Sequence, residues 1–176
     1  DLIKKISSER IRDEFSKIIM SPSPSSGIVM LEKFGLLKNI IPELEEGIKC
    51  EQLGEHIYDV WEHLLHALQH SADKNFPLEI RLAALFHDIG KPRTRRLAEA
   101  SGHALSKKKF TFYGHEVIGA RMVKKILERL KFPNKEIELV EKLVRNHMFF
   151  SDTEQITLSA VRRIITKMGV ENIWLL

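Results

Sequence analysis

The residue pair with the clearest chemical potential is His87-Asp88, which follows the apolar segment 78–86. Adjacent side chains on a helix point about 100° apart, so both can contact one ion only where a helix ends. Gly90 is expected to allow the tight turn there, and Lys91 to project at the same point as a phosphate partner. An imidazole nitrogen and a carboxylate oxygen suit a divalent cation such as Mn, Fe, Ni or Co, with Mg also compatible. The alternative is an ordinary histidine beside a capping aspartate, and the dipeptide alone does not decide.

A second group of histidines lies on one predicted helix upstream of this pair. His56, His63 and His70 are seven residues apart and therefore share one face of a helix, with His66 beside it. Their spacing leaves open which of them contributes to a site.

Two later segments also carry a histidine at one end. His115 begins the segment 115–130, and His147 follows the segment 134–146 on the face of its apolar residues. Each histidine taken alone is typical of a satisfied core or capping residue. Four helices that each present a histidine, one of them beside Asp88, instead favour ligands that converge inside a bundle. The sequence therefore predicts a candidate divalent-metal site.

The elements that must position these side chains are nearly all helical. Apolar residues recur at intervals of three and four, which is the period of an amphipathic helix, and sheet signals are nearly absent. The expected helices span residues 8–20, 26–34, 36–45 (broken at Pro42), 57–69, 78–86, 115–130, 134–146 and 157–168. The segment 93–113 is expected to be irregular, with the only short hairpin at 110–113, and 173–176 is interpreted as a helix cut short. The prediction is an all-α multi-helix bundle of about eight helices around one core.

The composition excludes several classes of protein. The chain has 176 residues, of which 43% are hydrophobic and 30% charged, and this excludes a disordered or collagen-like chain and suits one domain. The longest purely apolar run, residues 82–86, is too short to span a membrane. The single cysteine, Cys50, excludes an intramolecular disulfide and suits a reducing cytosol, so a cytoplasmic location is expected. An N-terminus without Met or a signal core is interpreted as that of a fragment.

The order of His63 and then His87-Asp88 resembles the HD phosphohydrolase superfamily, whose members are all-helical metal enzymes that cleave phosphoester bonds. The segment ALFHDIGK at 84–91 matches its pattern closely. The resemblance selects His63 among the histidines of its helix. With His115 and His147 added, the chain resembles the subset of the superfamily that can hold two metals. The implied metal ligands are His63, His87, Asp88, His115 and His147.

The same resemblance implies where these residues lie and what they do. His63, His87 and Asp88 are expected to meet at a common point, with His115 and His147 on its rim. The implied catalytic residues are His87, Asp88 and Lys91, and Lys91 would neutralise charge that develops on the phosphate.

The first 50 residues resemble the neck of bacterial tRNA nucleotidyltransferases and poly(A) polymerases. The matching segments are ISSERIRDEF at 6–15, SPSP at 21–24, FGLL at 34–37, IPEL at 41–44 and, in the HD part, VWEH at 60–63. In that family the Glu-Arg-Ile helix supports the nucleotide-binding face, and an HD domain often follows. The resemblance implies a neck at 1–50 and an HD domain at 51–176.

Two features of that family are absent from the sequence. No Asp-x-Asp, which holds magnesium in the family's catalytic head, occurs in the chain. The chain alone is therefore not expected to transfer nucleotides, and a head domain is expected upstream or in a separate chain. The superfamily's last ligand aspartate would lie on a helix that begins near residue 173, so the HD domain is expected to be truncated. Asp152 is the nearest substitute, and a loop cap suits it better.

Basic and aromatic residues suggest a second role. The net charge of +4 permits contact with nucleic acid without requiring it. The candidate RNA or phosphate contacts are Arg93, Arg95, Arg96, Lys107, Lys108 and Lys109, with Arg162, Arg163 and Lys167 further on. Phe110, Phe112 and Tyr113 could stack on bases. The alternative is a solvated loop and ordinary helix surface.

The leading functional hypothesis is a part of a tRNA nucleotidyltransferase or poly(A) polymerase family protein, which processes tRNA 3′ ends. Its HD site would be a divalent-metal phosphohydrolase for phosphomonoesters or 2′,3′-cyclic phosphates, with nucleotides as possible substrates and tRNA or other RNA as partner. One alternative is a non-catalytic RNA-binding helical module that keeps a relic HD site. The other is an independent HD phosphohydrolase, which the neck resemblance disfavours.

Overall fold

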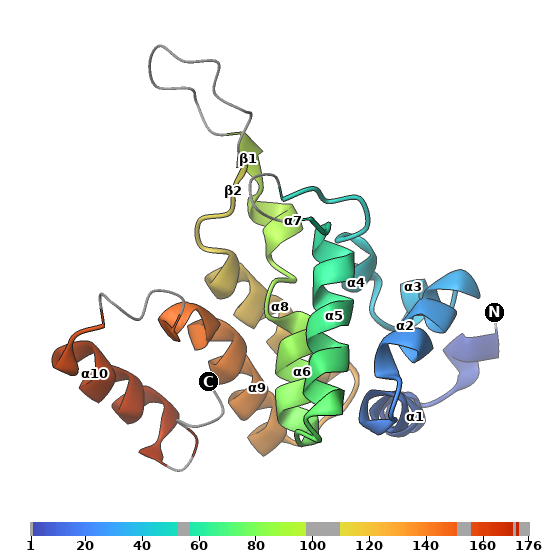
Figure 1. Ribbon diagram of the computed structural model, residues 1–176. Helices are drawn as coiled ribbons and strands as arrows, with labels where there is room; N and C mark the ends of the chain where they lie inside the picture. The colour runs from blue at the N-terminus through green and yellow to red at the C-terminus, as the bar shows by residue number, and fades with distance from the viewer. Residues whose placement is uncertain (1, 53–56, 98–109, 151–155, 171, 173–176) are drawn as a thin grey trace.

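The computed structural model describes residues 2–52, 57–97, 110–150, 156–170 and 172, and it confirms the all-α prediction (Figure 1). The helices are η1 (Leu2–Lys5), α1 (Ser8–Met20), α2 (Pro24–Lys33), α3 (Leu37–Ile40), α4 (Pro42–Glu45), α5 (Val60–Asp73), α6 (Leu78–Phe86), α7 (Lys91–Thr94), α8 (His115–Arg129), α9 (Asn134–Asn146), η2 (His147–Phe150) and α10 (Leu158–Met168). Within these ranges the only sheet is an antiparallel pair, β1 (Arg96–Leu97) and β2 (Phe110–Thr111). The short segment expected at 173–176 lies outside the described residues.

Helix α5, which carries His63, begins three residues later than the apolar pattern predicted. The side chain of Asp59 accepts a hydrogen bond from the Glu62 amide, and the Glu62 side chain accepts one from the Asp59 amide. This capping box starts the helix at Val60 and leaves Ile57 90% exposed in front of it. The apolar residue at position 57 was therefore misread as part of the helix.

The segment 93–113 contains more structure than the prediction of an irregular stretch allowed. Residues 91–94 form the short helix α7, with Pro92 in its first turn, where the missing amide costs no hydrogen bond. The expected hairpin at 110–113 is wrong in its pairing, because Phe110 and Thr111 pair with Leu97 and Arg96. A strand partner so distant in sequence leaves no local turn signal to recognise.

Helices α5, α6, α8 and α9 form the centre of the molecule, with α1–α4 against one side and α10 on the other (Figure 1). One apolar core runs through the central helices and into the first helices, and it includes the buried side chains of Phe15, Ile28, Leu64, Leu85 and Val123. A smaller cluster of Leu143, Ile164 and Met168 holds α10 against α9. The predicted neck therefore shares a core with the helices that carry the histidines.

Arg81 of α6 connects the first helices to the centre through the backbone. Its side chain is only 5% exposed, and it donates hydrogen bonds to the carbonyl oxygens of Ile19 and Ser21, each at 3.1 Å, and of Phe76 at 2.8 Å. The carbonyls of Ile19 and Ser21 lie at the end of α1, and the Ala72 carbonyl, a further acceptor of Arg81 at 3.5 Å, lies at the end of α5, where helices leave acceptors unsatisfied. Arg81 thus closes two helix ends at once.

None of the helices in the described ranges has the length and apolar composition needed to cross a lipid bilayer.

Candidate metal centre

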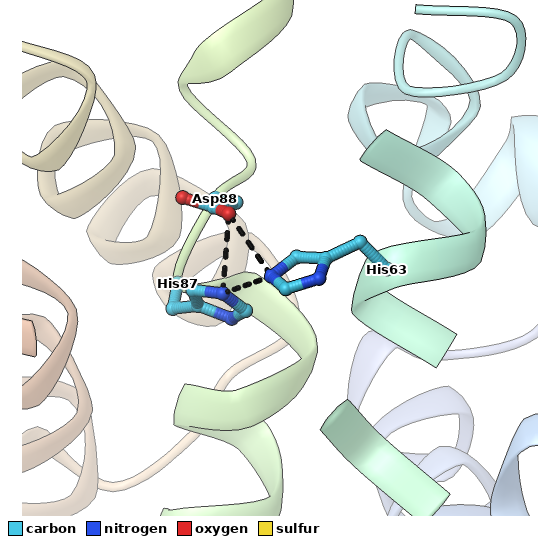
Figure 2. Close-up of side chains that lie close together, drawn as sticks. All are labelled: His63, His87 and Asp88. Carbon is cyan, nitrogen blue, oxygen red and sulfur yellow. Dashed lines mark hydrogen bonds and ion pairs between the residues drawn. The ribbon is translucent and has the colours of Figure 1, made fainter. Parts of the chain in front are cut away.

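Three helix ends and one helix turn bring the predicted ligands together. His87 and Asp88 follow α6 directly, at the point where the helix gives way to a turn. His115 is the first residue of α8, and His147 is the first residue after α9. His63 projects from the second turn of α5 towards the end of α6 (Figure 2). Helix ends make it possible for sequence neighbours such as His87 and Asp88 to reach one point.

The first group of ligands contains His63, His87 and Asp88 (Figure 2). The Nε2 atoms of the two histidines are 2.9 Å apart, and each lies 3.2 Å from Oδ2 of Asp88. All three candidate ligand atoms lie within 4.8 Å of one another, which is close enough for one ion to contact them all.

The second group contains the same aspartate with His115 and His147. Oδ1 of Asp88 lies 3.2 Å from Nε2 of His115 and 3.6 Å from Nε2 of His147, and those two nitrogens are 3.2 Å apart. The two oxygens of one carboxylate therefore face two different pairs of histidines. This is the arrangement that a carboxylate between two ions would have.

The protonation of the imidazole rings follows from their backbone contacts. Nδ1 of His87, His115 and His147 donates to the carbonyl oxygen three residues before it, at 2.8, 2.8 and 2.7 Å. A carbonyl can only accept, so in the neutral ring Nε2 carries a lone pair. The lone pairs of His115 and His147 then face each other and the Asp88 carboxylate. Such an arrangement is repulsive unless a cation or extra protons lie between these atoms.

The titration of the central groups reflects the same crowding. Burial raises the pKa of the Asp88 carboxyl, but its contacts with the four histidines lower the pKa by more, so the net shift is far downward. Burial lowers the pKa of His115, and the hydrogen bond and charge of Asp88 raise it by more. An ionised carboxylate surrounded by imidazoles favours a bound positive charge. The donor set of imidazole nitrogens and one carboxylate fits a borderline divalent metal.

Lys91 occupies a position that the sequence did not predict. Its Nζ lies 2.7 Å from Oδ2 of Asp88 and donates to Oε1 of Gln52 at 2.6 Å. It was expected to face a phosphate, whereas it is held against a ligand carboxylate. Gln52 is 2% exposed and was missed, since a glutamine in a loop before a helix gives no sequence signal. Its side-chain amide donates to the carbonyl of Tyr58, which fixes its orientation.

Gly90 lies in the expected turn, but the turn itself does not require a glycine at this position. Its φ of −80° is accessible to any residue. A Cβ atom there would instead overlap the carbonyl oxygen of His115 and lie 2.7 Å from the amide nitrogen of Gly119. The absence of a side chain therefore lets α8, and with it His115, approach Asp88.

The structure separates the remaining histidines from the site. His66 and His70 are exposed on α5, while His56 and Asp152 lie outside the described residues. The rim predicted for His115 and His147 is wrong, because their side chains are 10% and 17% exposed against 33% for His63. The most open ligand is thus the one on α5.

The basic residues predicted to contact RNA do not form one patch in the described ranges. Arg93 forms a two-point ion pair with Glu46, and Arg95 stacks 3.6 Å from the centroid of the Phe110 ring. Arg96 is exposed. Arg162, Arg163 and Lys167 are also exposed, on α10. Lys107, Lys108 and Lys109 lie outside the described residues.

Comparison with known proteins tests the resemblances. Residues 53–167 match the family model described as "HD domain". The chain belongs to the HD-domain family. Residues 1–48 of this HD-domain chain match a second model, "Probable RNA and SrmB- binding site of polymerase A", so the predicted family relationship is confirmed in both parts.

Relatives of this HD-domain chain are named tRNA nucleotidyltransferases and CCA proteins. It is 41% identical over 142 residues to the CC-adding tRNA nucleotidyltransferase of Thermus thermophilus and 39% identical over 142 residues to the A-adding tRNA nucleotidyltransferase of Deinococcus radiodurans. Each match covers 80% of the chain and 31% of the relative. The multifunctional CCA protein of Neisseria meningitidis serogroup A is 30% identical over 90% of the chain and 36% of the relative. The matched region thus spans about a third of each relative.

Proposed function

We propose that the cluster around Asp88 is a divalent-metal phosphohydrolase site within a protein of the tRNA nucleotidyltransferase and poly(A) polymerase family. One observation carries the proposal: the two oxygens of a single buried carboxylate face two separate pairs of histidines. His63 and His87 would hold one ion with Asp88, and His115 and His147 would hold a second. Mg, Mn, Ni, Co and Fe all remain candidates, and the imidazole-rich donor set favours the transition metals over Mg.

A divalent ion bound there would lower the pKa of a coordinated water and polarise the phosphate. The residues of the chain prepare the site for it. Three backbone carbonyls hold the rings of His87, His115 and His147 with Nε2 directed inward. Gln52 holds Lys91 beside the carboxylate, where its charge would neutralise the negative charge that develops on the phosphate during cleavage.

The substrate class follows from the family relationship. Phosphomonoesters and 2′,3′-cyclic phosphates are proposed, with tRNA or another RNA as partner in the cytoplasm. The matches at 1–48 and 53–167 support a division into a neck (1–50) and an HD domain (51–176). The chain holds no Asp-x-Asp, so it should not incorporate CTP or ATP into tRNA without a head domain.

The experiment is hydrolysis of a generic phosphodiester by the chain after metal removal and then addition of Mn²⁺ or Ni²⁺. Activity should appear with the metal, disappear with a chelator, and be absent in Asp88→Ala. Asp73→Ala, which removes an exposed carboxylate at the end of α5, is the matched control and should keep full activity. Wild-type hydrolysis that a chelator leaves unchanged would contradict the proposal.

The second candidate is the RNA-binding module without catalysis. The match of the neck to a model described as an RNA-binding site favours it. Neutralising Lys107, Lys108 and Lys109 should then reduce the salt dependence of RNA binding by about 0.7–0.9 log units per lost contact. Asp88→Ala should leave tRNA affinity unchanged, since an anionic side chain attracts no phosphate. RNA affinity that depends on the lysines and not on metal, together with no hydrolysis, would favour this candidate over the hydrolase.

A further inference from the structure

Helix α9 contacts both α8 and α10, and a cleft of about 550 Å³ lies among these three helices (Figure 1). A smaller cleft of about 280 Å³ adjoins it, because Asn146 and Lys167 line both. Small side chains such as Ala120 and Ala160 leave room between the helices. We call the two adjoining clefts the α9 groove.

Basic side chains from all three helices line the α9 groove. They are Arg121 of α8, Lys142 and Arg145 of α9, and Arg163 and Lys167 of α10. Arg145 pairs with Glu116 at 3.2 Å. The other four are exposed and form no ion pair with any residue that the structure describes. Their charge is therefore available to a ligand.

Two carboxylates also line the α9 groove, but they do not cancel this charge. Glu141 pairs with Lys124 at 3.7 Å, so its charge is already offset. Glu138 is exposed and has no ion-pair partner in the described ranges. The groove therefore keeps a surplus of positive charge, which attracts a polyanion.

The side chains of the groove distinguish between the possible polyanions. A protein partner would require apolar or aromatic anchors at the centre of its interface, and unpaired bases would require aromatic rings for stacking. Among the described residues that line the groove only Phe149 is aromatic, and it lies in the smaller cleft. A paired RNA stem stacks its own bases and presents its phosphates outward, so cations alone can hold it. The groove therefore suits a stem best.

We propose that the α9 groove binds the sugar-phosphate backbone of a paired RNA stem, at a site separate from the cluster around Asp88. None of the described residues that line the groove is a candidate metal ligand. The inference goes beyond the proposed hydrolase, because it requires neither metal nor cleavage. Three of the five cations, Arg121, Lys142 and Arg145, were not among the contacts predicted from the sequence. Only the packing of three helices brings them together.

The test measures binding of a fluorescent RNA hairpin to the chain by anisotropy, with EDTA present to exclude metal. The combined variant Arg121→Gln, Lys142→Gln and Lys167→Gln should bind at least about ten-fold more weakly, and its slope of log affinity against log salt should fall by about 2–3. The matched control is Lys74→Gln, Lys125→Gln and Lys135→Gln, which removes three exposed cations outside the groove. It should weaken binding by less than about three-fold.

Glu138→Gln tests the same groove with the opposite sign. Removal of this carboxylate should strengthen hairpin binding by about two-fold or more, and a misfolded variant could not produce such a gain. Unchanged or weaker binding would contradict the proposal.

The remaining outcomes separate the groove from the alternatives. An equal loss of affinity in the triple groove variant and in its control would overturn the proposal. A single-stranded RNA that binds as tightly as the hairpin, or polyglutamate that displaces the hairpin at the same concentration of charge, would overturn the paired stem as the ligand. Because metal is excluded, failure to bind the hairpin leaves the proposed hydrolase intact, and absence of hydrolysis leaves the groove intact.

Discussion

Arg81 and Asp88 are both buried charges, and they lie only seven residues apart at α6 and its end. Their exposed fractions are nearly equal, at 5% and 3%. Their partners differ in kind. Arg81 donates to backbone carbonyls at the ends of α1 and α5, whereas Asp88 is surrounded by four imidazoles and an ammonium group.

The difference shows how a buried charge can be assigned a role. The hydrogen bonds of Arg81 satisfy backbone carbonyls at or just beyond two helix ends, so its surroundings are complete without any ligand. Beside Asp88 the lone pairs of His115 and His147 face each other, and a cation or added protons would relieve their repulsion. The contrast supports a role in folding for Arg81 and the proposed role in metal binding for Asp88.

The largest expected effect is on hydrolysis by Asp88→Asn. The substitution keeps the shape of the side chain but removes the charge that both histidine pairs share. Phosphoester hydrolysis should fall at least about 1,000-fold, equivalent to about 4 kcal/mol, in steady-state assays with saturating Mn²⁺. A loss of less than ten-fold would show that the carboxylate does not hold the ion. Asp13→Asn, on the exposed face of α1, should match the wild type in the same assay.

Arg81→Met, in contrast, should reduce the stability of the fold and leave metal binding unchanged. It leaves several buried carbonyls without a donor, so the free energy of unfolding should fall by about 3 kcal/mol in urea titration. Metal should still stabilise this variant by about 2.7 kcal/mol at 100 times its Kd, as in the wild type. If metal no longer stabilises Arg81→Met, then Arg81 and Asp88 cannot be assigned separate roles. Arg121→Met, at an exposed position on α8, is the control.

Gly90→Ala should moderately reduce both the stability of the fold and its affinity for metal. The new methyl group would push α8 away from the end of α6 and cost about 1–3 kcal/mol of stability. Because His115 moves with α8, metal affinity should fall by about ten-fold or more, measured by calorimetry. Unchanged affinity in a destabilised variant would show that His115 is not a ligand.

The smallest expected effect is on stability, from an ion pair between the first helices and α8. Arg129 pairs with Glu43 through two contacts of 2.8 Å. Burial raises the pKa of Glu43, but the Arg129 hydrogen bond and charge lower it by more, so the net pKa is below its ordinary value. A lowered pKa contributes stability above the ordinary carboxyl pKa, and this contribution disappears as the pH falls through the pKa of the folded protein.

Glu43→Gln should therefore cost about 0.5–1 kcal/mol near neutral pH and progressively less in acid, as measured by thermal unfolding across pH. A cost that stays constant down to acid pH would contradict the role of the charge. Glu32→Gln, on α2, tests whether any carboxylate in the first helices has the same effect.

The helices and the site were predictable to different extents. Periodicity placed α6 and α9 with their observed bounds, because each buries one continuous apolar stripe. The spacing of the histidines on α5 did not select His63, since His70 has the same phase on the helix. The resemblance selected His63, and the structure places it 3.2 Å from Asp88.

The remaining features depend on contacts between distant segments. The role of Gly90 depends on the carbonyl of His115, and the orientation of Lys91 depends on Gln52, 39 positions away. No local pattern encodes such pairs. For the same reason the partner of β2 could not be identified from the aromatic run that contains it.

The most direct test of the metal centre is anomalous diffraction from crystals of the chain soaked in Mn²⁺ or Co²⁺. The account predicts a peak beside Asp88, with histidine Nε2 atoms at about 2.0–2.3 Å from the ion. Occupation by His63 and His87, by His115 and His147, or by both pairs would agree with it. Anomalous peaks at other positions of the chain, with none at Asp88, would contradict it.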